Sequence, residues 1–346
     1  VYKRQVLVDE TRNAMPPIAA AFYGNPTRDL RVAGITGTNG KTTTTELIQR
    51  ILSAGGVSCE SCGNYGRPLA DVVLDDEPPA AISLELSSFQ LETTRQFRPH
   101  VAVWLNFSPD HMDRYETVED YRAAKLHIFD NQTEGDHAVI RLGEDLGDLR
   151  ATRTTFSATE AGGDYGLDGT WIRFGGEPVL DLAETRLRGT HNAENVMAAV
   201  AAGQALAVSF ECASRALAGY APPLHRCELV GTLDGVEYIN DSKATNLHAL
   251  ASALRSQNRP TVLIAGGKEK GLDYRPLLPL LEEKVQSVVL IGEIGATLSG
   301  CFSETVPCEV ADSLEEAVER ARQQSAPGGT VLFSPGTSSF DMFRGY

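Results

Sequence analysis

The chain has 346 residues, which is too long for one ordinary domain, so two domains of roughly 150 residues are expected. Its 42% hydrophobic and 22% charged residues are typical of a globular protein with a sizeable core. A net charge of −15 argues against binding to nucleic acid or to a membrane surface. The sequence has no apolar run of about 18 residues, so no membrane span is predicted. Cys59 and Cys62 form a C-x-x-C without a second pair for zinc, so a reducing, cytoplasmic location is expected.

In the first half of the chain, short apolar runs alternate with helical patterns. Predicted buried strands cover 32–36, 81–85 and 101–105, and predicted helices cover 42–52, 118–129 and 192–207. This alternation predicts an α/β fold with a mostly parallel sheet. Residues 142–185 contain glycine pairs and short apolar runs, and this segment is predicted to form a small antiparallel elaboration.

A break is predicted at Pro222-Pro223, because two prolines cannot continue a helix. After the break, the same alternation resumes. Predicted strands cover 236–240, 261–265, 288–291 and 330–334, and predicted helices cover 245–256 and 313–324. We therefore expect a P-loop-type domain over 31–223, followed by a Rossmann-like α/β domain over 224–346.

The segment RVAGITGTNGKTTTTELIQRIL (31–52) places a glycine-rich turn between a predicted strand and a predicted helix. A strict P-loop, G-x-x-x-x-G-K-[ST], needs a glycine where Ile35 stands. The turn still meets the physical need, because glycines let backbone N–H groups approach phosphate and the helix N-terminus favours anions. Lys41 can reach the β- and γ-phosphates of a nucleotide, and Thr42 can bind Mg²⁺. The candidate ATP-binding residues here are Gly37, Thr38, Asn39, Gly40, Lys41, Thr42 and Thr43.

Three further segments carry candidate site residues. Glu85 ends a predicted buried strand, where a carboxylate beside a phosphate loop is a candidate ligand for Mg²⁺. His111 lies in NFSPDHMDRY (106–115), a cluster of polar residues after the next strand. Lys125 lies in the predicted helix YRAAKLHIF (121–129), one turn from Tyr121. Taken alone, His111 is typical of an ordinary histidine with its hydrogen bonds satisfied, and Lys125 is typical of a surface lysine.

Together the motifs resemble the Mur ligase family of ATP-dependent, amide-forming enzymes of peptidoglycan synthesis. The resemblance rests on GTNGKT (37–42), ELSSFQLE (85–92), NFSPDHMDRY (106–115), GTHNAEN (189–195), HRCE (225–228) and NDSKATN (240–246), in the order of the family. The wording of 85–92 is similar to the branch that adds D-glutamate. The resemblance implies catalytic roles for Lys41, Lys125 and His111. It also implies two Mg²⁺ ions held by Thr42, Glu85, His111 and a carbamylated Lys125.

The resemblance also implies binding residues for the other substrates. For the nucleotide they are Asn195, Arg226, Asp241 and Lys243. For the acceptor and the amino acid they are Asn64, Ser87, Thr245, Lys270, Ser339 and Tyr346. Without the resemblance, Asp241, Lys243 and Thr245 could equally be helix-cap and turn residues.

The implied activity is the addition of D-glutamate to UDP-N-acetylmuramoyl-L-alanine through an acyl phosphate, by a monomer. Residues 1–30 are then expected to be a linker or the remnant of a missing UDP-binding domain, and the last domain is expected to be truncated. Three alternatives stay open. Residues 8–45 look more like the sibling ligase that adds the third peptide residue, although its D-N-P-R motif is absent. A folylpolyglutamate-type ligase and a non-catalytic ATP-binding remnant are the others.

Overall fold

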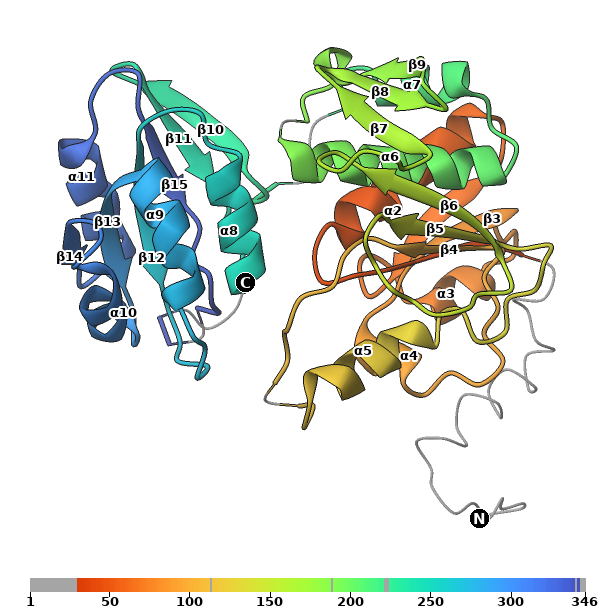
Figure 1. Cartoon of the computed structure of the whole chain (residues 1–346), viewed down its shortest axis with the longest axis horizontal. Helices are drawn as coiled ribbons and strands as arrows, with labels where there is room; N and C mark the ends of the chain where they lie inside the picture. Colours follow the sequence, from red (N-terminus) through yellow and green to blue (C-terminus); the bar gives the residue numbers. More distant parts are fainter. Residues whose placement is uncertain (1–29, 113, 188, 221–223, 340, 343–346) are drawn as a thin grey trace. The chain divides into compact units, whose positions relative to one another are not determined.

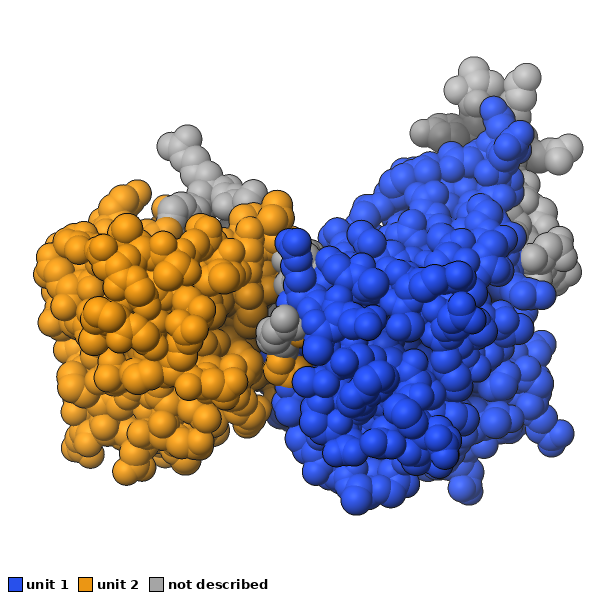
Figure 2. Space-filling model, turned by 90° about the horizontal axis from the view of Figure 1, so that it is seen from above, with its two compact units in different colours: residues 1–186, 190–220 blue, residues 187–189, 221–346 orange. Residues whose placement is uncertain are grey.

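The computed structural model describes residues 30–112, 114–187, 189–220, 224–339 and 341–342. It divides into two compact units: Val1–Arg186 with Thr190–Tyr220, and Leu187–Gly189 with Ala221–Tyr346 (Figure 2). The sequence-based expectations for residues 1–29, for the break at Pro222-Pro223 and for Tyr346 lie outside the described residues.

The first unit is built on one large sheet with strand order β2-β3-β1-β4-β5-β6-β7-β8-β9. Strand β1 lies inside it and pairs in parallel with both β3 and β4. The strands are β1 (Arg31–Thr36), β2 (Cys59–Gly63), β3 (Ala81–Glu85), β4 (Val101–Trp104), β5 (His137–Arg141), β6 (Thr152–Ser157), β7 (Tyr165–Asp168), β8 (Trp171–Phe174) and β9 (Glu177–Asp181). Because β1, β3 and β4 are parallel neighbours, their carboxyl ends present Thr36, Glu85 and Trp104 at one edge.

Helices cover both faces of this sheet. In Figure 1, α2 and α6 lie on one face, while α3, α4 and α5 lie on the other. The helical segments are α2 (Lys41–Ala54), α3 (Leu69–Val73), α4 (Ser88–Leu91), α5 (Val118–Leu126), the 3₁₀ turn η2 (Leu182–Glu184), α6 (Thr190–Ala205) and α7 (Phe210–Leu217). Helix α2 buries Leu47, Ile48, Ile51 and Leu52, whose spacing places them on one helical face. That face packs against the sheet and fixes the start of α2 beside the end of β1.

The prediction for residues 142–185 is partly wrong. Strand β6 pairs in parallel with β5, and β7 pairs in parallel with β6, so both extend the main sheet. Only β8 and β9 are antiparallel additions. The reason is packing: Phe156 of β6 is completely buried and continues the core of the sheet. A short strand pattern does not reveal the direction of pairing, which depends on that tertiary contact.

The second unit is a six-stranded sheet with strand order β10-β11-β15-β12-β13-β14. Its strands are β10 (Glu228–Leu233), β11 (Val236–Asn240), β12 (Thr261–Gly266), β13 (Val285–Ile291), β14 (Cys308–Val310) and β15 (Thr330–Phe333). Its helical segments are α8 (Leu247–Arg255), the 3₁₀ turn η3 (Arg275–Leu277), α9 (Leu278–Lys284), α10 (Gly295–Phe302) and α11 (Leu314–Gln324). Among the strands that the structure describes in this unit, only the β10–β11 pair is antiparallel.

Both sheets are dominated by parallel strands, so the predicted α/β class is confirmed. Among the described residues, none of the helices has both the length and the apolar character needed to span a lipid bilayer.

Candidate active site

The glycine-rich turn between β1 and α2 is held in shape by Asn106, which lies two residues beyond the end of β4. The Asn39 N–H donates to Asn106 Oδ1 at 2.9 Å, and Asn106 Nδ2 donates back to the Asn39 carbonyl at 3.1 Å. The Thr38 N–H donates to the Asn106 carbonyl at 3.0 Å. Sequence reasoning did not single out Asn106. Its signal was its place as the first residue of NFSPDH, two residues after the end of a buried strand.

Gly40 sits at the N-cap of α2 with a left-handed backbone, at φ 84°. A Cβ atom added at residue 40 would lie 2.2 Å from Asn195 Oδ1, so the close approach of α6 requires glycine. Asn195 is buried, and its amide also contacts Thr44 and Asn192. The structure thus brings Asn195, a predicted nucleotide-binding residue, against the end of the phosphate loop.

Two lysines share one acceptor in this loop. Lys41 Nζ donates to the carbonyl oxygens of Gly37 and Thr38, each at 2.9 Å. Lys125 Nζ, from α5, donates to the same Gly37 carbonyl at 2.9 Å. The side chain of Lys125 is 2% exposed. Burial and the adjacent Lys41 ammonium lower the pKa of Lys125 well below its usual value, against the opposing charges of Asp110 and Glu85.

Lys125 packs against one ring of an aromatic cluster. Its Nζ lies 4.8 Å from the centre of the Tyr121 ring, as the one-turn spacing of the two residues on α5 predicts. Burial raises the pKa of Tyr121, and the hydrogen bond with the Thr38 side chain opposes that rise. The ring of His111 meets Tyr121 edge-on, with centroids 5.9 Å apart. Tyr121 was not predicted as a site residue, although, like Lys125, it links α5 to the phosphate loop.

Glu85 forms the opposite wall. Its carboxylate is almost fully buried and accepts from Thr42 Oγ1 at 2.8 Å and from Asn64 Nδ2 at 2.9 Å. The Asn64 N–H also donates to the Glu85 carbonyl oxygen at 2.9 Å. These contacts bring together three residues that are far apart in the sequence.

The oxygen atoms at this wall fit Mg²⁺. Hydroxyl and carboxylate oxygens are ligands that Mg²⁺ prefers. Thr42 Oγ1 and Glu85 Oε2 are such oxygens, and the hydrogen bond between them places them side by side.

His111 and Ser87 are less closely integrated. His111 has a positive φ of 57° and a side chain 44% exposed, with Nε2 3.9 Å from Asp110 Oδ2. Within the described ranges, no three His, Cys, Asp or Glu side chains are grouped as a metal site. Ser87 is the N-cap of α4, where it exchanges hydrogen bonds with Gln90. The proposed metal role of His111 and substrate role of Ser87 stay predictions.

Among the described site residues predicted in the second unit, Asp241 has the most strongly shifted pKa. Its carboxylate accepts from Ser334 Oγ at 2.9 Å and from the Cys227 N–H at 3.1 Å. Burial raises the pKa of Asp241 to about 6, although these hydrogen bonds and the charge of Arg226 lower it. Arg226 and Asp241 therefore lie close together, as the predicted nucleotide site requires.

The residues predicted to bind the amino acid lie on neighbouring loops of this unit. Lys270 Nζ donates to the Thr245 carbonyl at 3.1 Å, and the Thr245 N–H donates to the Lys243 carbonyl at 3.0 Å. The loop before Lys270 is joined to the loop before Ser339, because the Lys268 N–H donates to the Ser338 carbonyl at 2.7 Å. Lys243, Thr245, Lys270 and Ser339 are thus carried by loops that contact one another.

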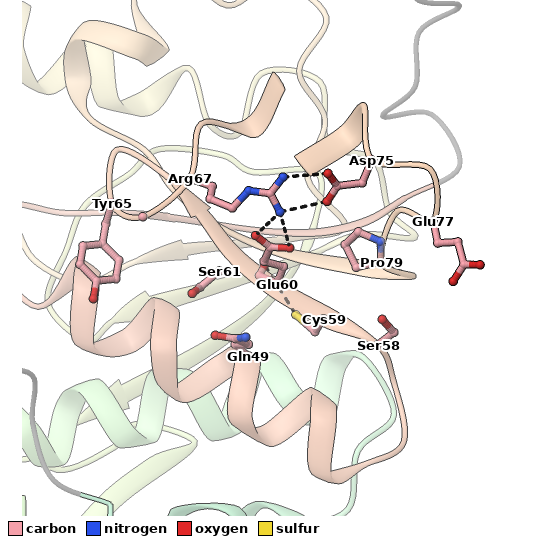
Figure 3. Close-up of a pocket in the computed structure, with 11 residues that line it drawn as sticks. Gln49, Ser58, Cys59, Glu60, Ser61, Tyr65, Arg67, Asp75, Glu77 and Pro79 are labelled. Atoms are coloured by element: carbon pink, nitrogen blue, oxygen red, sulfur yellow. Dashed lines mark hydrogen bonds and ion pairs between the residues drawn. The ribbon is translucent and has the colours of Figure 1, made fainter. Parts of the chain in front are cut away.

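A separate pocket of about 590 Å³ lies along edge strand β2, outside all of these sites (Figure 3). Arg67 is its basic residue, and it is paired with Glu60 at 3.1 Å and with Asp75 at 2.8 Å. Because these two carboxylates neutralise the Arg67 guanidinium, the pocket has no excess positive charge to attract a phosphate.

Comparison with protein families matches both units. Residues 35–203 match the Mur ligase middle domain, and residues 225–336 match the Mur ligase glutamate ligase domain. The chain is 44% identical over 324 residues to the UDP-N-acetylmuramoylalanine–D-glutamate ligase of Geobacter metallireducens, covering 91% of this chain and 72% of that protein. It is 42% identical to the ligase of the same name from Chlorobaculum parvum, covering 91% of this chain and 73% of that protein.

Solved structures give the same fold. The MurF ligase of Acinetobacter baumannii superposes with a TM-score of 0.73 at 21% identity, covering 98% of this chain and 80% of that one. The MurF ligase of Thermotoga maritima, solved with ADP, gives 0.72 at 20% identity, covering 96% and 82%. The folylpolyglutamate synthase of Mycobacterium tuberculosis gives 0.72 at 17% identity, covering 94% and 92%.

Proposed function

The chain belongs to the Mur ligase family, and we propose that it joins D-glutamate to UDP-N-acetylmuramoyl-L-alanine in an ATP-dependent step of peptidoglycan synthesis. The observation that carries this proposal is the convergence of Lys41, Thr42, Glu85 and Lys125 on one phosphate loop. The chain also matches curated relatives that bear the name of that ligase, and the match covers most of their length.

The reaction runs in two steps. A carboxylate oxygen of the alanine attacks the γ-phosphorus of ATP, the bond to the β-phosphate oxygen breaks, and ADP leaves with that electron pair. The amine of D-glutamate then attacks the acyl carbon, phosphate leaves and the nitrogen loses a proton. The protein positions the reactants and stabilises the charge that develops between them.

Lys41 neutralises phosphate charge in the first step. In the structure its ammonium satisfies two loop carbonyl groups, Gly37 and Thr38. A nucleotide phosphate would offer it a stronger, charged partner within the same loop. The backbone N–H groups at the start of α2 would bind the same phosphates, aided by the positive end of the helix.

A bound magnesium ion would neutralise phosphate charge beyond what Lys41 provides. Thr42 and Glu85 would hold it through oxygens that already lie 2.8 Å apart. Asn64 orients the Glu85 carboxylate by donating to its other oxygen. We propose two ions, the second held by His111 and a modified Lys125.

Lys125 is proposed to carry a carbamate. Its lowered pKa increases the fraction of neutral amine, and a neutral amine attacks CO₂ and then loses a proton to give an anionic carbamate. This change would replace a buried cation beside Lys41 with a buried anion. It would thus convert a like-charge contact into an attraction and supply two oxygen ligands.

The remaining assignments divide between the two units. Nucleotide binding is proposed for Asn195, Arg226, Asp241 and Lys243. Binding of the UDP-linked acceptor is proposed for Asn64 and Ser87, and binding of D-glutamate is proposed for Thr245, Lys270, Ser339 and Tyr346. The enzyme is proposed to act as a monomer in the cytoplasm.

The direct test is an ADP-release assay with UDP-N-acetylmuramoyl-L-alanine, Mg²⁺ and ATP. Release beyond the first turnover should require both the acceptor and D-glutamate, because the acyl phosphate forms on one substrate and is consumed by the other. ADP release that is indifferent to the acceptor would count against the ligase assignment.

A further inference from the structure

We propose that Glu46 is a positioning residue that holds the loop of residues 63–67 and thereby sets Asn64 against Glu85. This inference rests on the proposed function, because Glu85 matters as a ligand of the nucleotide-bound metal ion. Glu46 lies on α2 and is not among the residues to which the sequence motifs or the proposed mechanism assign a role.

The carboxylate of Glu46 is clamped by two phenols. Tyr65 Oη donates to Oε1 at 2.7 Å, and Tyr220 Oη donates to Oε2 at 2.9 Å. Both carboxylate oxygens are therefore engaged by partners that lie on different segments of the first unit. Hydrogen bonds to an ionised acceptor are about twice as strong as bonds between neutral groups.

Tyr220 fixes the direction in which Glu46 points. Its side chain is buried, and its carbonyl accepts from the Arg186 N–H at 2.8 Å. The guanidinium of Arg50, one turn beyond Glu46 on α2, lies 4.9 Å from the centre of the Tyr220 ring. With one oxygen held by this rigid partner, the other oxygen is aimed at Tyr65.

Tyr65 connects Glu46 to the active site, because Asn64 is the neighbour of Tyr65 in the chain. Asn64 donates to Glu85 through both its backbone and its side chain, and Glu85 in turn accepts from Thr42. Figure 3 shows Tyr65 extending from the loop after β2 toward helix α2. Thr42 and Glu46 are four residues apart on α2, so the network starts and ends on one helical face.

Arg67 anchors the far end of the loop through its pairs with Glu60 and Asp75, and Glu46 supplies a second anchor beside Asn64 through Tyr65. Asn64, Gly66 and Arg67 are exposed, and one backbone hydrogen bond, Gly63 N–H to the Arg67 carbonyl, closes the turn. Removing the Glu46 carboxylate would leave the Tyr65 phenol without this acceptor. Asn64 would then lose the restraint that keeps its amide aimed at Glu85.

The test that needs no catalysis is amide hydrogen exchange at residues 63 and 64, whose N–H groups bond to Arg67 and Glu85. In Tyr65→Phe and Glu46→Ala, exchange of these amides should become about tenfold faster, the change expected when one charge-assisted hydrogen bond is lost. Tyr165→Phe is the matched control, because it removes a phenol from a buried tyrosine on β7 of the same unit. Unchanged exchange in Tyr65→Phe would overturn the proposal.

The kinetic arm separates positioning from mere stability. Glu46→Ala should raise the half-saturating Mg²⁺ concentration and the KM for the UDP-linked acceptor, while the KM for D-glutamate stays unchanged. Glu46→Gln retains one oxygen acceptor and should recover part of the loss. An equal rise in all three constants would contradict the proposal. If the parent protein shows no ligase activity, the proposed function fails, and the exchange experiment still decides the role of Glu46.

Discussion

Lys41 and Lys125 both donate to the Gly37 carbonyl, and their different burial gives them different roles. Lys41 is half-buried at the first position of α2, where a phosphate can replace its carbonyl partners. Lys125 is enclosed by Tyr121 and the loop, where its positive charge is disfavoured by burial and by Lys41. One lysine is thus suited to bind an anion, and the other is suited to lose its charge.

Lys41→Ala should abolish ligation, because the loop then lacks the cation that meets the γ-phosphate. A loss of about 10³-fold in kcat/KM would correspond to roughly 4 kcal/mol of transition-state stabilisation. The measurement is steady-state ADP release, with circular dichroism to verify folding. Near-normal turnover in this variant would remove the loop from the proposed mechanism.

Lys125→Ala should also lose activity, and short carboxylic acids added to the assay should restore part of it by replacing the carbamate oxygens. The parent protein, equilibrated with ¹³C-labelled CO₂, should show a carbamate resonance that Lys125→Ala lacks. Active, magnesium-bound parent protein without that resonance would exclude the modification.

The raised pKa of Asp241 predicts how the stability of the fold depends on pH. A folded-state pKa of about 6, against the ordinary value of 3.8, means that the folded state favours the protonated acid. The resulting stabilisation is fully present below pH 3.8 and is lost as pH rises through about 6. The shift corresponds to about 3 kcal/mol at most.

Asp241→Asn should remove this dependence. Between about pH 4 and pH 7, the free energy of unfolding of the parent should fall relative to that of the variant, which has no carboxyl group to titrate at this position. Urea unfolding followed across that range measures the difference. Parallel pH profiles for the two proteins would show that the Asp241 carboxyl does not titrate as its burial implies.

At the scale of elements, the start of α2 depends on how closely α6 approaches it. Gly40 and Gly56 flank α2 and share a left-handed backbone, at φ 84° and 82°. A Cβ atom at residue 40 meets Asn195, whereas a Cβ atom at residue 56 meets nothing within 4 Å. The two glycines therefore form a matched pair that separates backbone strain from steric conflict.

Gly56→Ala should cost about 1–2 kcal/mol of stability from the left-handed backbone alone. Gly40→Ala should cost that amount plus roughly 1–3 kcal/mol for displacing the buried Asn195. It should also weaken nucleotide binding, which Gly56→Ala should leave intact. Thermal unfolding and ADP titration measure both effects, and equal losses in the two variants would contradict the role of the α2–α6 contact.

Sequence patterns predicted the elements that carry the phosphate loop, because β1 and β3 are short apolar runs, α2 has helical apolar spacing and a glycine-rich turn separates β1 from α2. They did not predict β2, whose residues Cys59–Gly63 lack an apolar alternation and gain their strand character by pairing with β3. The same limit applies to single residues. Lys41 and Glu85 follow from local motifs, whereas Asn106 and Glu46 act through contacts with residues distant in the sequence.

At the scale of the whole molecule, the two units divide the proposed chemistry. The first unit carries the phosphate loop, Glu85 and both lysines, and the second carries the loops of Thr245, Lys270 and Ser339. In this assignment the second unit selects the amino acid. Lys270 offers a cation to a carboxylate of D-glutamate and would repel the additional ammonium group of a diamino acid.

The most direct test is the mass of the product formed from UDP-N-acetylmuramoyl-L-alanine, ATP and Mg²⁺ with D-glutamate, L-glutamate, L-lysine or meso-diaminopimelate. We expect a product with D-glutamate and none with L-glutamate, because inversion at the α-carbon moves the amine away from the acyl phosphate. A product that contains either diamino acid, with none that contains D-glutamate, would contradict the account.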